Sequence, residues 1–481
     1  MTARAVMVLG TTSGAGKSWL ATALCRWYAR RGLKVAPFKA QNMSNNARVV
    51  PGVGGRLGEI GSAQYFQALA ARCTPEVRMN PVLLKPERDT ASQVVVMGEV
   101  RADLAAVPWR ERSEALWPYG REALHGLMGE NDVVVIEGAG SPAEINLHSS
   151  DYVNMRTALE VHAACLLVTD IDRGGAFAHL YGTHQLLPAA EARLIRGFVL
   201  NRFRGDASLL APGPQMLERL TGVPTLAVLP MWRGHGLPEE DGVFGDSPVK
   251  QPGLQIAIVA CPRISNLDEF QPLRNLPGVA LRWARTPAEL EGADWIILPG
   301  SKHTSSDLAW LRAQGLEEAI KRHAAASKPV LGLCGGLQML GETLLDPHGV
   351  DGSAQGLGLL PLSTRFEPTK QLRETGAQWG ELKGPWSALS GLSFNGYEIH
   401  HGRTESCGGV PVVLRNDEGA AIGWQQGSVL GLYAHGLFES AEMMRALFGA
   451  EVRGLDAVFD GLADFIDQHF ERDSLLNLLN P

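Results

Sequence analysis

The stretch VLGTTSGAGKSWLATALCRWYARRG, residues 8–32, decides the fold of the first half of the chain. An apolar run ends at its first glycine, and a helical pattern begins at Lys17 and Ser18. Glycines let backbone N–H groups close around a phosphate, the helix N-terminus adds its dipole, and a Lys-Ser pair contacts phosphate and Mg²⁺. The first glycine, Gly10, stands one position early, with Thr11 in the expected place. We predict a nucleoside triphosphate site; an ordinary strand-to-helix turn is the alternative. The ATP-binding residues expected in this loop are Thr11, Thr12, Ser13, Gly14, Gly16, Lys17 and Ser18.

Composition limits the class of protein. The 481 residues exceed what one core normally supports, and 45% hydrophobic with 20% charged residues is typical of a folded globular chain. A net charge of -7 without a basic block argues against a nucleic-acid partner. The N-terminus lacks a charged and apolar leader, and no apolar run is long enough for a membrane span. We therefore expect two or three domains, no membrane partner and a cytoplasmic location; the oligomeric state is not predictable.

Cysteine usage agrees with a reducing compartment. The six cysteines are scattered without a C-x-x-C pair, which argues against a disulfide framework and against a zinc site. They are Cys25, Cys73, Cys165, Cys261, Cys334 and Cys407.

Two series of β-rich runs alternate with helical stretches. Continuous apolar strands separated by helices indicate parallel sheets that are covered on both faces. A Gly-, Pro- and acid-rich stretch interrupts the alternation after residue 233. We predict an α/β protein of two doubly wound domains, with a synthetase-type domain at 1–233, a linker at 234–252, a second domain at 253–447 and a C-terminal helical tail at 448–481.

Polar residues follow several strands of the first series. Glu137 ends the run DVVVIE, and ligands gather at such strand ends in open α/β sheets. Because Mg²⁺ prefers oxygen ligands, we expect Ser18, Glu137 and Glu59 as metal ligands, with Glu59 at a helix start. Asn201 follows another strand, where its amide is placed for a purine edge. Asp170, Asp172 and Arg173 follow a third and face phosphates or an anionic substrate; a structural ion pair is the alternative.

The amide-rich stretch KAQNMSNN, residues 39–46, follows a strand of the first series. Its uncharged donors and acceptors lie on the same predicted edge as the phosphate loop. A substrate site and a simple Asn-rich turn are both open. The substrate candidates here are Lys39, Gln41, Asn42, Ser44, Asn45 and Asn46.

The second half contains a nucleophile elbow. In KPVLGLCGGLQML, residues 328–340, a sharp turn between strand and helix exposes Cys334 at a helix N-terminus. His435, in GLYAHGLF, follows another strand and is the expected base. Backbone N–H groups of Gly300, Ser301 and Gly335 are the expected oxyanion hole. A buried core cysteine and a surface histidine are the alternative.

Several motifs together resemble a known family. The elbow, LPGSKHTSSDL (298–308) and YAHGLF (433–438) are similar to class I glutamine amidotransferase domains, which have a flavodoxin-like fold. The phosphate loop, IEGAGSPAEINL (136–147) and LNRFRGD (200–206) are similar to the dethiobiotin-synthetase-like ATP-binding fold. Their order resembles the cobyrinic and cobyric acid amidating synthases. QNMSNN, MNPVLLKP (79–86), DIDRGGAF (170–177) and YEIHHGRT (397–404) resemble the cobyric acid synthases in particular.

The resemblance implies a reaction and its partners. Such enzymes are ligases that amidate the b, d, e and g carboxylates of adenosylcobyrinic acid a,c-diamide through acyl phosphates. Each amidation uses one ATP with Mg²⁺ and one glutamine, and no tightly bound cofactor is implied. Cys334 would attack glutamine and His435 would transfer the proton. Most class I glutaminases carry a glutamate two residues after the histidine, where this chain has Leu437. Glu439 or a backbone carbonyl would then orient His435.

Three rival functions stay open from the sequence. A cobyrinic acid a,c-diamide synthase uses the same chemistry on other carboxylates. A cysteine hydrolase joined to an ATP-dependent module is the second. The third is a P-loop switch ATPase whose second domain only senses a ligand.

Overall fold

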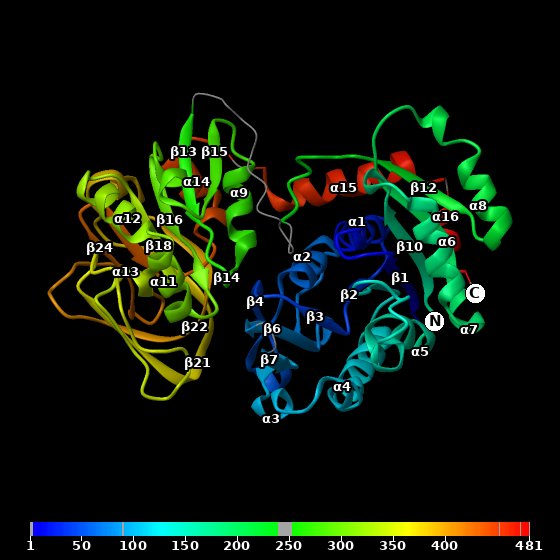
Figure 1. Ribbon diagram of the computed structural model, residues 1–481, viewed down its shortest axis with the longest axis horizontal. Helices are drawn as coiled ribbons and strands as arrows, with labels where there is room; N and C mark the ends of the chain where they lie inside the picture. The colour runs from blue at the N-terminus through cyan, green and yellow to red at the C-terminus, as the bar shows by residue number, and fades with distance from the viewer. Residues whose placement is uncertain (1–2, 89–90, 239–252, 452, 472, 481) are drawn as a thin grey trace.

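The computed structural model describes residues 3–88, 91–238, 253–451, 453–471 and 473–480, and two α/β bodies are visible in it (Figure 1). Most of the predicted linker, residues 239–252, lies outside the described residues. Among the described residues, no helix has the length and apolarity that crossing a membrane requires.

The first body contains a sheet of six parallel strands. Its register pairs Gly10 with Val168 and Val8 with Glu137, so the strands end at one common edge. The phosphate loop and the polar residues after neighbouring strands therefore lie at this edge. In spatial order the strands are β12 (Thr225–Pro230), β11 (Ile195–Phe203), β10 (Ala164–Asp170), β1 (Arg4–Gly10), β9 (Val133–Glu137) and β2 (Val35–Phe38).

Helices cover both faces of this sheet, as the continuous apolar strands predict. Along β1, Val6 and Val8 face one apolar layer, while Met7 and Leu9 face the other. The first layer contains α1 (Lys17–Ala29), α2 (Ser62–Ala70) and α15 (Leu455–His469). The second contains α4 (Trp109–Glu130), α6 (Ala176–Leu186) and α8 (Gly213–Thr221).

The C-terminal helices return to the first body. Figure 1 shows α15, in red, running beside α1, in blue, with α16 (Ser474–Asn477) next to the sheet. Arg26 of α1 is buried and pairs with Asp456 at 2.6 Å and with Asp460 at 2.8 Å. The Tyr28 hydroxyl donates to the carbonyl of Leu475. The last segment of the chain therefore completes the core around the helix that follows the phosphate loop.

Two small β structures extend the first body. The amide-rich stretch, which we expected as a loop, is in part a strand, because β3 pairs in parallel with β6. The sheet and the neighbouring ribbon consist of β3 (Gln41–Met43), β6 (Val82–Arg88), β7 (Ala91–Val96) and β8 (Glu99–Val100), and of β4 (Ala47–Pro51) with β5 (Leu57–Gly61).

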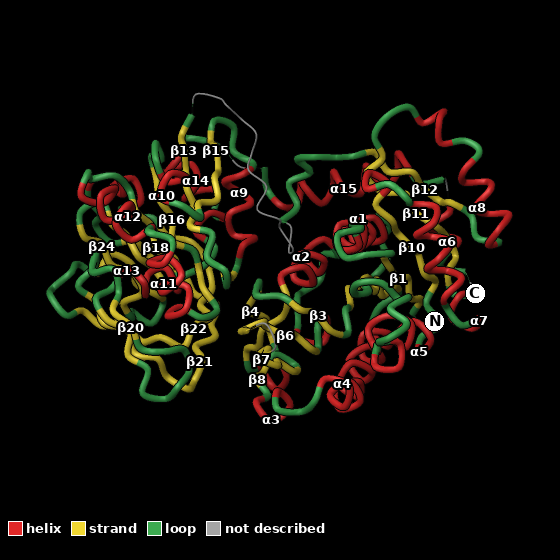
Figure 2. The backbone as a smooth tube through the Cα atoms, viewed as in Figure 1, coloured by secondary structure: helices red, strands yellow, loops and turns green. Residues whose placement is uncertain are grey.

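The second body has one large mixed sheet (Figure 2). Five parallel strands form one side, in the order β15 (Val279–Ala284), β13 (Leu254–Val259), β16 (Trp295–Leu298), β18 (Val330–Leu333) and β25 (Val429–Leu432). The sheet continues through β24 (Ala421–Gln426), β23 (Val412–Asn416), β21 (Leu362–Trp379), β19 (Thr343–Leu345) and β20 (Ala354–Gln355), and β22 (Ser393–Ser406) pairs with β21. The predicted α/β class is confirmed, and the second sheet differs from the expected parallel sheet in its antiparallel extension beyond β25.

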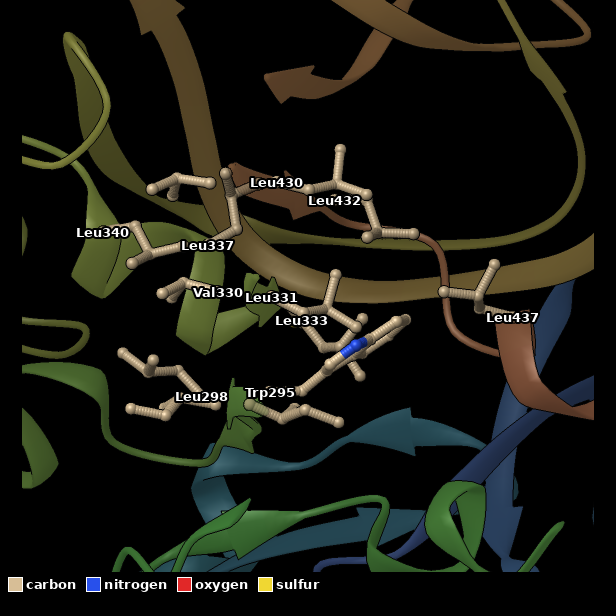
Figure 3. Close-up of a cluster of buried hydrophobic side chains, with 14 of the residues drawn as sticks. Trp295, Leu298, Val330, Leu331, Leu333, Leu337, Leu340, Leu430, Leu432 and Leu437 are labelled. Carbon is tan, nitrogen blue, oxygen red and sulfur yellow. The ribbon is translucent and has the colours of Figure 1, made fainter. Parts of the chain in front are cut away.

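Helices and an apolar core support the second sheet. The helices are α9 (Gln271–Arg274), α10 (Pro287–Leu290), α11 (Thr304–Ala313), α12 (Leu316–Ala325), α13 (Gly335–Leu340) and α14 (Ala441–Phe448). Figure 3 shows leucines of β18, α13 and β25 clustered together. This packing fixes the turn between β18 and α13, where Cys334 lies.

The packing of α15 gives a stability prediction. Leu462 is fully buried in the layer around α1, and truncation of such a leucine costs about 2–5 kcal/mol through lost burial and a cavity. Leu462→Ala should therefore lower the unfolding free energy of the first body, measured by urea denaturation. The exposed Gln468→Ala on the same helix is the control. Equal stability of the two variants would contradict the role of α15 in this core.

Candidate functional site

The phosphate loop connects β1 to α1 with two glycines in the left-handed region, Gly14 at φ 67° and Gly16 at φ 102°. Lys17 Nζ reaches back over the loop and donates to the carbonyls of Thr12 (2.9 Å) and Gly140 (3.1 Å). A Cβ on Gly10 would lie 2.9 Å from Lys17 Nζ. The early glycine therefore leaves room for the lysine.

A buried carboxylate, Glu137, faces this loop from the end of β9. Its Oε1 accepts from Ser18 Oγ and from Lys39 Nζ, both at 2.8 Å, and its Oε2 accepts from Gln67 at 2.5 Å. Burial opposes ionisation, but the charge of Lys39 and these hydrogen bonds outweigh it and lower the pKa of Glu137. Ser18 and Glu137 thus offer adjacent oxygen ligands, which suit Mg²⁺ that also binds nucleotide phosphates.

The described residues contain no group of three or more His, Cys, Asp or Glu side chains arranged to hold a metal by themselves. A hydroxyl and one carboxylate fit an ion that keeps several waters and shares phosphate ligands.

A cavity of about 780 Å³ opens over the phosphate loop. Its lining includes an aromatic cluster: Trp232 stacks on Phe465 of α15 with ring centroids 4.8 Å apart, and Trp19 packs edge-on against both. The sequence-predicted residues in its lining are Ser13, Gly14, Gly16, Lys17, Ser18, Lys39, Asn42, Glu137, Asp170, Asp172, Arg173 and Asn201.

The other predicted ligands lie outside this lining. Thr11 bonds Thr169 through its hydroxyl, and Thr12 contributes its carbonyl to Lys17. Gln41 accepts from the Tyr152 hydroxyl. Ser44 accepts from the backbone N–H of Asn46, and Asn45 is also absent from the lining. Asn46 accepts from the N–H of Leu267 at 2.7 Å, which places it against the second body. The structure therefore divides the amide-rich stretch between the cavity and the contact with the second body.

Glu59 is not at a helix start and does not lie in the cavity lining. It belongs to β5 and is fully buried between Lys85 (2.9 Å) and Lys370 of β21 (2.6 Å). The two lysines occupy both carboxylate oxygens, so Glu59 joins the two bodies. The structure brings Ser18 and Glu137 together without Glu59.

The remaining polar residues at the strand ends already have partners. Asn201 donates to the carbonyl of Ala15 at 2.9 Å and accepts from the N–H of Arg202, so its amide holds the phosphate loop. Its contact with a purine stays a prediction. Asp170 pairs with Arg202 at 2.9 Å and with Arg173 at 3.4 Å. Asp172 pairs with Arg204.

In the second body Cys334 occupies a strained turn, with φ 51° and ψ −103°. The glycines that follow allow close packing: a Cβ on Gly336 would collide with the carbonyl of Leu298, and one on Gly335 would lie 2.7 Å from the Ser301 nitrogen. β17 (Gly300–Ser301) therefore lies directly against the elbow. The structure brings together Cys334 and the three residues predicted for the oxyanion hole.

His435 contacts Cys334 and a carboxylate that the sequence analysis missed. Its Nδ1 lies 3.2 Å from Glu269 Oε2, and both side chains are buried. Burial disfavours the charged imidazole, but Glu269 and Cys334 outweigh it and raise the pKa of His435 to about 10. The Tyr397 ring stacks on the imidazole with centroids 5.1 Å apart. The group thus holds a protonated His435 beside Cys334 Sγ.

Neither orienting group expected for His435 has that role. Glu439 pairs with Arg48 of the first body and not with His435. The group that orients His435 is the carboxylate of Glu269, where a backbone carbonyl was the other expectation. Glu269 precedes His435 by 166 residues and lies in the short helical turn NLDEF (266–270), which follows β14 (Ile264–Ser265). The sequence signal that could have pointed to Glu269 is the pair of adjacent acids, Asp268 and Glu269, in a turn that follows an apolar stretch. Arg48, Gln67 and Phe465 were also missed.

Comparison with known proteins finds a nucleotide-binding domain and an amidotransferase domain in this chain. Residues 6–233 match the family model of the CobQ/CobB/MinD/ParA nucleotide binding domain, and residues 255–443 match the CobB/CobQ-like glutamine amidotransferase domain. Curated relatives over nearly the full length are the cobyric acid synthases of Methylibium petroleiphilum (75% identical, 99% of this chain and 97% of the relative), Leptothrix cholodnii (70%, 100% and 98%) and Variovorax paradoxus (66%, 100% and 100%).

The Glu269–His435 contact gives a prediction for histidine titration. Without the Glu269 carboxylate, the burial that disfavours imidazolium is offset by Cys334 alone, so Glu269→Gln should lower the pKa of His435. In ¹⁵N-histidine NMR, His435 should stay protonated through neutral pH in the parent protein and titrate at lower pH in the variant. A His435→Gln variant assigns the signal. An unchanged titration would contradict the pairing.

Proposed function

The chain belongs to the family of cobyric acid synthases, which are glutamine-dependent amidotransferases, and we propose that it amidates the b, d, e and g carboxylates of adenosylcobyrinic acid a,c-diamide. One observation carries the proposal. A buried Cys334–His435–Glu269 group and a phosphate-loop cavity occur on one chain, in two bodies joined by buried ion pairs. One site is suited to release ammonia and the other to activate a carboxylate.

Glutamine hydrolysis uses the elbow. Cys334 Sγ, with its proton held by His435, attacks the carboxamide carbon of glutamine, and the N–H groups of Gly300, Ser301 and Gly335 stabilise the oxyanion. His435 gives its proton to the leaving ammonia, and a thioester remains on Cys334. Water then attacks this thioester, His435 accepts a proton from the water, glutamate is released and Cys334 Sγ is again paired with protonated His435. Glu269 keeps the imidazole oriented throughout.

Carboxylate activation uses the phosphate-loop cavity. A carboxylate oxygen of the corrinoid attacks the γ-phosphorus of ATP, ADP leaves, and an acyl phosphate forms. Lys17 stabilises the transferred phosphoryl group, while Ser18 and Glu137 would hold the Mg²⁺ that neutralises phosphate charge. Ammonia then attacks the acyl carbon and phosphate leaves. Lys39, Asn42 and Arg173 line the same cavity, which supports a role for them in binding corrinoid carboxylates and amides.

Transfer between the sites needs protection of ammonia, because at neutral pH most free ammonia is protonated and not nucleophilic. We propose that it passes along a covered path from Cys334 to the phosphate-loop cavity. The buried ion pairs that hold the two bodies together support this proposal.

Six unpaired cysteines support a cytoplasmic location.

The two reactions can be separated by mutation. Cys334→Ala should abolish amidation with glutamine and retain it with ammonium, because the variant lacks only the ammonia source. Corrinoid mass after incubation with Mg·ATP and amide-¹⁵N glutamine measures the outcome, and four stepwise additions are expected in the parent protein. An unchanged corrinoid mass with continuing ATP hydrolysis in the parent protein would refute the proposed function.

The two carboxylates first considered for Mg²⁺ can also be distinguished. Glu137→Gln should raise the Mg²⁺ concentration for half-maximal ammonium-supported amidation by roughly 10-fold or more, because it removes the carboxylate beside Ser18. Glu59→Gln is the matched comparison and should leave this Mg²⁺ dependence unchanged, since Glu59 lies between two lysines away from the cavity lining. The reverse pattern would assign the metal to Glu59.

A further inference from the structure

A short segment of the first body, residues 46–48, lies directly on the turn that carries Glu269. Asn46 Oδ1 accepts from the N–H of Leu267 at 2.7 Å, and the N–H of Ala47 donates to Asn266 Oδ1 at 3.4 Å. Asn266 is buried and begins the turn in the left-handed conformation. The backbone before Glu269 is therefore held by hydrogen bonds that the first body supplies.

Arg48 continues this contact with a buried guanidinium group. Its Nε donates to Asp268 Oδ2 at 3.1 Å, and Nη2 contacts the same oxygen. Its Nη1 and Nη2 donate to the two carboxylate oxygens of Glu439 at 3.0 and 2.6 Å. Asp268 is next to Glu269 in sequence, and Glu439 lies four residues after His435. One guanidinium group thus bridges the two segments that carry the histidine and its carboxylate partner.

Aromatic rings surround the same guanidinium group. Its carbon lies 4.9 Å from the ring centroid of Tyr397 and 5.0 Å from that of Phe66. Tyr397 stacks on His435 and accepts from Asn266 through its hydroxyl at 3.1 Å. Arg48 therefore supports the ring that covers the imidazole as well as the turn beside its Nδ1.

The position of Arg48 depends on α2 of the first body. Phe66 of α2 contacts the guanidinium group and also lines the phosphate-loop cavity. Gln67 of the same helix donates to Glu137. The helix that packs on Arg48 thus belongs to the nucleotide site and not to the second body.

We infer that Arg48 is a positioning residue for glutamine hydrolysis, supplied by the ATP-binding body to hold the Glu269–His435 pair of the other body. The inference rests on the proposed function. Arg48 touches neither the thiol nor the imidazole in the described structure, so its effect passes through Asp268, Glu439 and Tyr397. Glutamine hydrolysis then depends on a residue outside the amidotransferase domain.

The charges around the pair determine the expected pH dependence. Glu269 faces His435, Asp268 and Arg48, and His435 faces Glu269, Cys334 and Tyr397. Burial raises the pKa of Glu269; Asp268 raises it further, while His435 and Arg48 lower it. Loss of Arg48 should therefore protonate Glu269 at higher pH and remove the acceptor for His435 Nδ1. The acid limb, at which kcat of glutamine hydrolysis falls as the pH is lowered, should therefore move to higher pH.

The test uses the full chain with Arg48→Met, Arg48→Lys and Arg78→Met. Arg78 also joins two carboxylates, Glu76 and Glu130, but within the first body, so it controls for the loss of an ion-paired arginine. Arg48→Met should lower kcat of glutamine hydrolysis roughly 10- to 100-fold with little change in KM, and shift the acid limb upward. Arg48→Lys should retain the acid limb and recover part of kcat. Arg78→Met should match the parent protein in kcat and in the position of the acid limb.

Ammonium-supported amidation separates this inference from the proposed function. It should persist in folded Arg48→Met while glutamine-supported amidation falls. Equal loss of both would make Arg48 merely structural and overturn the inference, as would an unmoved acid limb. If Arg48→Met does not fold, Arg48→Lys decides: a kcat equal to the parent's overturns the inference, and a drop of threefold or more with intact ammonium-supported amidation supports it. Failure of the parent protein to amidate with either nitrogen source refutes the proposed function instead.

Discussion

Charges buried between the two bodies determine how the two sites are placed. Glu59 is fully buried and needs Lys85 from its own body and Lys370 from the other; Arg48 needs Asp268 and Glu439 in the same way. A buried charge without its partner costs several kcal/mol. Burial lowers the pKa of Lys370 to about 7, even with Glu59 beside it. A displacement of one body would leave such groups unpaired, so the ion pairs favour a single relative position. The α15 segment adds a second connection, because it follows the amidotransferase body in sequence and packs on α1.

The parts of both sites that depend on local chemistry were predictable from the sequence. A phosphate loop needs its glycines, lysine and serine within a few residues, and a nucleophile elbow needs small residues around its cysteine. These requirements leave short motifs, so Lys17, Ser18 and Cys334 were identified together with the parallel-sheet fold. Glu137 was found for a related reason, since the end of a buried strand is a position defined by pattern.

Residues whose partners lie far away in the sequence could not be found in this way. Glu269 lies 166 positions before His435 in the sequence, and the usual position of the orienting carboxylate is occupied by a leucine. Glu59 was assigned to the metal because it was expected at a helix start near the phosphate loop; its lysine partner at position 370 belongs to the other body. The structure of the amide-rich stretch could not be predicted for the same reason, because the pairing of β3 and the contact of Asn46 with Leu267 depend on distant segments.

Isotope competition tests most directly whether the two bodies work as one unit. The protein would amidate adenosylcobyrinic acid a,c-diamide with amide-¹⁵N glutamine in the presence of excess unlabelled ammonium, and mass spectrometry would give the label in each new amide. Transfer along a covered path predicts that the amides carry ¹⁵N almost entirely, whatever the ammonium concentration. Label diluted to the composition of the mixed ammonia pool would contradict the account, because ammonia would then leave the protein before it reaches the activated carboxylate.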